Sequence, residues 1–193
     1  MKLIFPLLAF VMILLSCNNS GKTEEAAIEK EPPEKQSFFP VTTFLKGEIY
    51  NIKKDGINPL KYSTVNGHTD SVWLKVEELD AALAEFLHPE IDSSNLVSLF
   101  TEKSFLDQSI YAITFTYDAS VPLPDSMQLK HWDVYIDPEF NTVKRIYMVK
   151  EISKTLTLQL TWVSKKWCKI TSIVTDKNGE TKVEKEEKII WDF

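Results

Sequence analysis

The sequence predicts an α+β fold in which N-terminal helices pack on an antiparallel, meander-like β-sheet of about six strands. Three observations support this prediction. Apolar residues recur at helical spacing in the first part of the domain, and they alternate with a period of two from residue 109 onward. Short connections join the alternating segments, which suits antiparallel neighbours. Helices followed by strands is the usual order of elements in an α+β domain.

The helical part is predicted to begin at Pro40, because proline suits the first position of a helix. The apolar residues that follow at steps of four, four and three, and therefore share one face, are Val41, Leu45, Ile49 and Ile52. A second helix is predicted over residues 76–87, and Pro89 ends it. Its apolar stripe consists of Val76, Leu79, Leu83, Phe86 and Leu87. A shorter helix is expected after residues 92–94, and the helices are expected to cover the apolar face of the sheet.

Turn signals and alternating segments predict the strands. Asn66-Gly67 predicts a tight hairpin within residues 60–74, because a type I′ turn needs positive φ at both central residues. Asn178-Gly179 predicts another hairpin. The six segments predicted to form the meander are residues 110–117, 131–137, 143–152, 156–162, 167–175 and 188–193. One face of this sheet is expected to be apolar and the other to carry threonine, lysine and aspartate.

The N-terminus combines one charged residue, Lys2, with an apolar run over residues 3–15. Thirteen residues span about 20 Å as a helix, short of the roughly 30 Å core of a bilayer, so the run is typical of a signal peptide. The sequence Leu14-Leu15-Ser16-Cys17 then resembles the lipobox of bacterial lipoproteins. This resemblance implies cleavage between Ser16 and Cys17, a diacylglyceryl thioether on Cys17 and acylation of the new amino terminus.

The predicted organisation is a signal peptide over residues 1–16, a lipidated cysteine with a disordered acidic tether over residues 17–36, and one α+β domain over residues 37–193. The tether is rich in glutamate and lysine and has almost no large apolar residue, so it cannot bury enough surface to offset its ordering entropy. Leader and tether resemble those of small envelope lipoproteins of Gram-negative bacteria of a Bacteroidota type, and the body resembles no enzyme family. Because Asn18 rather than aspartate follows the cysteine, this resemblance implies the outer membrane.

Composition narrows the classes of partner. The formal net charge is −6, and loss of residues 1–16 removes one lysine and leaves −7. Nucleic-acid binding rests on lysine and arginine that neutralise phosphates, so no nucleic-acid partner is expected. The expected membrane attachment is the lipid on Cys17. With that residue acylated, Cys168 has no disulfide partner within the chain, and the alternation of its strand predicts that it faces the core.

No catalytic residue, metal ligand or cofactor is predicted. The three histidines, His68, His88 and His131, are not spaced to present two ligands on one face, and the core cysteine has no C-x-x-C mate. Acid–base chemistry is open to a set of polar residues if they converge in a pocket. These residues are His68, Asp70, His131, Asp133 and Asp137. A hydrolase-like enzyme that uses them is one hypothesis.

Two further hypotheses need no catalysis. The first is a membrane-anchored binding or scaffolding lipoprotein whose partner is an envelope protein or a ligand. Tyr135 and Trp167 are its candidate surface, because they lie on the polar faces of their predicted strands and carry both an apolar body and a polar handle. The second is a carrier of a small apolar ligand in a cavity between the helices and the sheet, lined by tryptophan and tyrosine.

Overall fold

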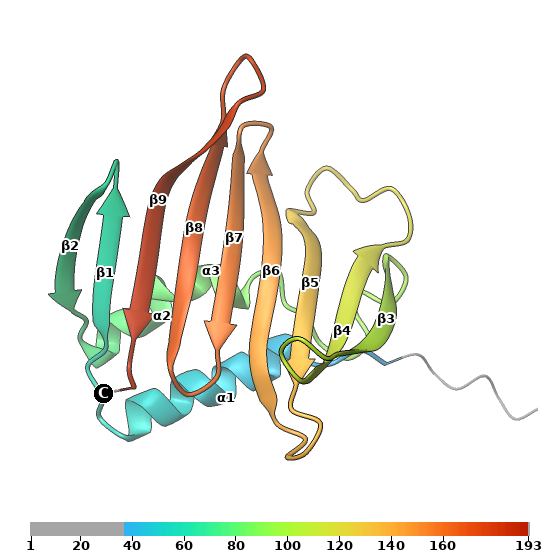
Figure 1. Ribbon diagram of the computed structural model, residues 1–193, viewed down its shortest axis with the longest axis horizontal. Helices are drawn as coiled ribbons and strands as arrows, with labels where there is room; N and C mark the ends of the chain where they lie inside the picture. The colour runs from blue at the N-terminus through green and yellow to red at the C-terminus, as the bar shows by residue number, and fades with distance from the viewer. Residues whose placement is uncertain (1–36, 193) are drawn as a thin grey trace, which may run out of the picture. The chain divides into compact units, whose positions relative to one another are not determined.

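The computed structural model describes residues 37–192, which form one antiparallel sheet with helices on one of its faces (Figure 1). The strands are β1 (Leu60–Val65), β2 (His68–Trp73), β3 (Phe100–Asp107), β4 (Ala112–Ala119), β5 (Leu129–Ile136), β6 (Val143–Ser153), β7 (Leu156–Val163), β8 (Trp167–Thr175) and β9 (Thr181–Ile190). The helices are α1 (Val41–Lys54), the 3₁₀ turn η1 (Val76–Glu78), α2 (Leu79–Ala82) and α3 (Ala84–Leu87). The predicted signal peptide, Cys17 and the tether lie outside the described residues.

Strand order is β2-β1-β9-β8-β7-β6-β5-β4-β3 (Figure 1). From β3 to β9 each strand pairs with the next strand of the chain, as in a meander. The exception is the early β1–β2 hairpin, which joins the sheet through β1 beside β9. The first strand and the last therefore pair, and only β2 and β3 form the edges of the sheet within the described residues.

The predicted fold class was wrong. The sequence predicts N-terminal helices on about six strands, whereas the described residues form nine strands, one helix of 14 residues and three helical pieces of three or four residues. The prediction missed β3, which reads FTEKSFLD and lacks alternation. As an edge strand, β3 is largely exposed and needs no apolar face. The hairpin at Asn66-Gly67 was predicted, but its pairing with β9 joins residues more than a hundred positions apart and leaves no local pattern.

The predicted helix over residues 76–87 is broken into η1, α2 and α3. Leu83 separates α2 from α3 with φ −107° and ψ 4°, outside helical values. At the end of α3 the carbonyl of Glu85 lacks a helical donor, because Pro89 has no N–H. The Nζ of Lys150 on β6 donates to that carbonyl at 3.3 Å and to the Glu85 carboxylate. A contact from the sheet therefore replaces the missing helical bond. The shorter helix predicted after residues 92–94 does not form either, and bends and turns occupy that segment.

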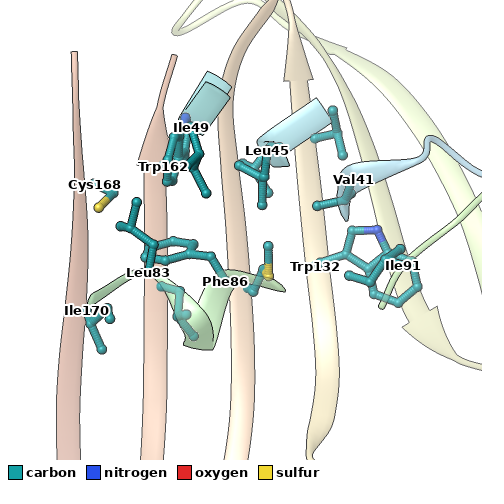
Figure 2. Close-up of a cluster of buried hydrophobic side chains, with 14 of the residues drawn as sticks. Val41, Leu45, Ile49, Leu83, Phe86, Ile91, Trp132, Trp162, Cys168 and Ile170 are labelled. Atoms are coloured by element: carbon teal, nitrogen blue, oxygen red, sulfur yellow. The ribbon is translucent and has the colours of Figure 1, made fainter. Parts of the chain in front are cut away.

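The core lies between α1, the short helices and one face of the sheet. The apolar residues of α1 that were expected on one face are all buried. In Figure 2, Val41, Leu45 and Ile49 point toward the sheet, where Trp132 and Trp162 lie. Leu83 and Phe86 fill the space below them, and the ring of Phe86 is 5.4 Å from that of Trp162. Cys168 lies in the same layer and is buried, as the alternation of its strand predicts. Burial raises the pKa of its thiol.

An aromatic cluster ties the start of the domain to the sheet. The rings of Tyr117 and Trp132 stack with centroids 4.5 Å apart and planes 8° apart. Phe38 meets both rings edge-on, at 5.0 and 6.1 Å. The N–H of Phe39 donates to the hydroxyl of Tyr117 at 3.2 Å. These contacts hold the first residues of the domain beside β4 and β5.

Candidate functional site

A pocket of about 700 Å³ lies at one end of the sheet, where the β3–β4, β5–β6 and β7–β8 connections meet the first half of α1. Its volume is within the range of small-molecule sites. The lining residues are Phe39, Phe44, Glu48, Ile110, Ala112, Tyr135, Asn141, Thr142, Val143, Lys144, Arg145, Val163, Ser164, Lys165 and Lys166. The pocket therefore draws on both the helix and three separate strand connections.

One part of the lining is apolar. The rings of Phe39 and Phe44 lie 5.9 Å apart and pack together. Phe39 is held in place by the Tyr117 hydroxyl, and Phe44 belongs to the first turns of α1. Val143, at the start of β6, and Val163, at the end of β7, contribute aliphatic surface. This part offers an apolar molecule a surface that is already positioned.

The other part of the lining is basic. Lys144 donates to the carbonyls of Ile110 and Tyr111 at 3.2 and 3.1 Å, which ties the β3–β4 connection to β6. Arg145 lies over the ring of Tyr135, with the guanidinium carbon 5.4 Å from the centroid. Within residues 37–192, Arg145, Lys165 and Lys166 form no ion pair. Three positive side chains are thus left for a ligand.

The one carboxylate of the lining, that of Glu48, is already bonded. Its Oε2 accepts the hydroxyl of Ser164 at 2.9 Å and the backbone N–H of Lys165 at 2.8 Å. Lys165 has φ +62°, the left-handed conformation that closes the β7–β8 turn. Glu48 therefore fixes this turn to α1, and it holds the backbone that carries Lys165 and Lys166.

The two predicted surface aromatics do not come together. Tyr135 lines the pocket, and its hydroxyl donates to Asp133 at 3.2 Å. Burial, with the nearby Asp133 carboxylate, raises the pKa of Tyr135 to about 12. Trp167 lines neither this pocket nor two smaller ones of about 390 and 280 Å³. The ammonium of Lys188 lies 4.6 Å above its ring instead.

A polar cluster on β4 and β5 brings together His131 and two aspartates. The Nδ1 of His131 is 2.9 Å from Asp118 Oδ1, and its Nε2 is 3.2 Å from Asp133 Oδ2. Thr116 donates to Asp133 at 2.7 Å. Only the protonated imidazole can donate from both nitrogens, so the bonds to Asp133 and Asp118 raise the pKa of His131 although burial opposes the shift. Burial of Asp133 favours its neutral form, but the bonds from His131 and Thr116 outweigh it and lower the pKa.

This cluster predicts how stability depends on pH. The pKa of His131 is raised in the folded state. The stability that its protonated form contributes is therefore complete below the ordinary histidine value of 6.5 and is lost as pH rises through the folded pKa. The pKa values of Asp118 and Asp133 are lowered. The stability that these carboxylates contribute is therefore complete above the ordinary aspartate pKa of 3.8 and is lost as pH falls through the folded pKa values. We expect the free energy of unfolding to decrease on the alkaline side, with a smaller decrease in His131→Gln. Urea denaturation between about pH 5 and 9 measures this difference, and equal pH slopes in the two proteins would contradict it.

The remaining candidates for acid–base chemistry are scattered. His68 and Asp70 lie on β2, whose residues are all exposed. Asp137 accepts the backbone N–H groups of Glu139 and Phe140 and so shapes the β5–β6 turn. His131 and Asp133 do converge, but neither lines any of the three pockets described above. Among residues 37–192, no group of three or more histidine, cysteine or acidic side chains is arranged to hold a metal ion.

Sequence reasoning missed most of the pocket. It singled out Tyr135 but neither Lys165 nor Lys166. The available signal was the doublet in the turn "SKKW". Nothing in the sequence placed that turn beside Phe39 and Phe44, because these residues lie about 120 positions away.

No family model matches the chain, and neither a curated protein nor a solved structure matches it.

Proposed function

We propose that the chain is a non-catalytic binding lipoprotein, anchored to the cell envelope through Cys17, whose domain binds a small, partly apolar ligand in the pocket at the end of the sheet. The observation that carries this proposal is the lining of that pocket, which combines packed aromatic rings with unpaired cations. Binding sites commonly join an apolar surface to a few placed polar groups. The outer membrane is the proposed location, and it follows from the resemblance of residues 14–18 to lipoprotein leaders.

A binding role fits the lining better than a catalytic one. The described residues that line the pocket include no histidine or cysteine. The hydroxyl of Ser164 donates to Glu48, and Glu48 in turn holds the N–H of Lys165. Both donors to this carboxylate belong to the β7–β8 turn, so Glu48 serves to fix that turn against α1.

In the proposal, residues 17–36 connect the lipid anchor to the domain. The domain begins at Ser37, two residues before Phe39, which lines the pocket. Within residues 37–192 no helix is long and apolar enough to span a bilayer. In the proposal, acyl chains on Cys17 hold the protein at the membrane, since each buried CH₂ contributes about 0.8 kcal/mol.

Mass spectrometry of the chain purified from its own envelope tests this proposal. We expect the intact mass to lack residues 1–16 and to carry acyl groups, and we expect a native spectrum to contain a small non-covalent adduct. Val163→Trp fills the pocket from β7 and should remove the adduct. Val183→Trp is the matched control, because Val183 is 55 % exposed on β9 and does not line the pocket.

The proposal fails if the wild-type spectrum shows no adduct, or if Val163→Trp keeps the adduct at the wild-type level. A chain that retains Met1 and carries no lipid would contradict the anchoring half. Circular dichroism of both variants shows whether the domain still folds.

A further inference from the structure

We infer that the pocket takes a single-chain amphiphile with an anionic head group, a carboxylate or a phosphate, rather than a neutral apolar molecule. This inference rests on the proposed function and names the ligand class of the same site. It follows from how charge and apolar surface are divided around the pocket.

The charge of the lining is opposite to that of the chain. The chain has a formal net charge of −6, whereas the lining contains four basic residues and one acidic residue. The acidic residue, Glu48, already accepts two hydrogen bonds. Clustered cations of this kind attract an anion into the pocket although the protein as a whole is acidic.

The pocket cations also differ from many other lysines of the domain. Lysines that form ion pairs with carboxylates elsewhere are Lys46, Lys53, Lys61, Lys103, Lys130, Lys150, Lys169 and Lys185. Arg145, Lys165 and Lys166 form no ion pair within residues 37–192. The planar guanidinium of Arg145 suits a carboxylate or phosphate, because it can donate two parallel hydrogen bonds.

The apolar side of the pocket supplies the surface for a chain. Phe39 and Phe44 pack 5.9 Å apart, and Val143 and Val163 lie in the same lining. An inorganic anion would use only the cations, and a neutral hydrocarbon would use only this apolar surface. A molecule with both parts uses the whole lining, and a metal cation is disfavoured by the positive charge.

The test uses the full chain in phosphatidylcholine nanodiscs with a photoreactive palmitic acid that carries a diazirine, and with the methyl ester of the same probe. We expect the acid to crosslink to pocket residues, with half-saturation at a concentration about tenfold lower than that of the ester. The triple variant Arg145→Gln, Lys165→Asn and Lys166→Gln should raise the half-saturating concentration of the acid about tenfold and leave that of the ester within about twofold. Asparagine is chosen at residue 165 because it tolerates the left-handed conformation.

The matched control removes the same charge from the opposite end of the sheet. Its substitutions are Lys154→Asn, Lys177→Gln and Lys182→Gln, all at exposed positions outside the pocket. This control should bind the acid within about twofold of wild type if local charge is the cause. Competition by palmitate against competition by lysophosphatidic acid then distinguishes a carboxylate ligand from a lipid phosphate, and inorganic phosphate alone should compete with neither probe.

The outcomes separate this inference from the function it rests on. Equal binding of acid and ester, unaffected by the triple variant, overturns the anionic ligand and leaves the proposed pocket function standing. Loss of acid binding in both triple variants also overturns it, because the effect then comes from total charge. If neither probe crosslinks to the pocket while the purified chain still carries an adduct, the inference fails and the proposed function stands. If no adduct is found either, both proposals fail.

Discussion

Replacing Trp132 with alanine is expected to lower the free energy of unfolding by about 4 kcal/mol. The side chain is fully buried on β5 and stacks on Tyr117 at 4.5 Å. Phe100 and Phe38 meet its ring at 4.7 and 6.1 Å. Alanine would leave a cavity among three rings that come from separate segments of the chain, and those segments cannot close over it without losing packing elsewhere. Urea denaturation followed by circular dichroism measures the loss.

The same substitution at Trp167 is the matched control, because that ring lies outside the core and contacts Lys188. We expect Trp167→Ala to reduce stability by about 1 kcal/mol. Trp132→Phe should fall between the two, because its ring keeps part of the stacking and the indole N–H of Trp132 has no hydrogen-bond partner among the described residues. Equal losses for Trp132→Ala and Trp167→Ala would contradict the central place of Trp132 in the core.

Replacing Glu85 with alanine is expected to cost about 3 kcal/mol of stability, at the lower end of what loss of a buried charge partner costs. Lys150 on β6 is buried, with 2 % of its side chain exposed, and its ammonium bonds to the carboxylate and carbonyl of Glu85. The carboxylate itself is 46 % exposed. Without that carboxylate, the Lys150 ammonium keeps only the Glu85 carbonyl as a partner, and its positive charge stays buried without a counter-charge. Thermal and urea unfolding measure the loss.

A double substitution separates the charge from the packing. Lys150→Met removes the buried charge and keeps a long apolar side chain, so it should recover most of the stability when combined with Glu85→Ala. Lys46 and Glu90 form an exposed pair, with 58 % and 62 % of the side chains exposed, so Glu90→Ala is the matched control. Its expected loss is below about 1 kcal/mol. A loss in Glu85→Ala that Lys150→Met does not reverse would show that the cost comes from the helix and not from the lysine.

The parts of the fold that were predicted depend on neighbouring residues. The apolar steps of α1 and the alternation of β5 to β8 arise from contacts that repeat along one element, and the structure confirms these elements. The Asn66-Gly67 turn is confirmed as well, with φ of 50° and 82°. The strand count was wrong because β3 is an exposed edge and because β1 finds its partner in β9.

The candidate site was predicted less completely than the fold. Tyr135 was singled out because of its outward position, and it does line the pocket. Its companion Trp167 lies elsewhere, under Lys188. The convergence of His131, Asp133 and Asp118 required the register of β4 on β5, which places Asp118 opposite His131. A register of this kind is set by the whole sheet and cannot be obtained from one strand.

The chain's local patterns were sufficient to predict the first helix, the alternating strands and a buried Cys168, because each depends on residues close together in sequence. They also carry the resemblance that predicts a leader and a lipid anchor at Cys17, both of which lie outside the described residues. The strand order, the interrupted second helix and the pocket depend on contacts between distant segments. Glu48 meets the β7–β8 turn across more than a hundred residues, and Lys150 meets Glu85 across 65. Such contacts form only when the domain folds, so the pocket and its unpaired cations are properties of the tertiary structure.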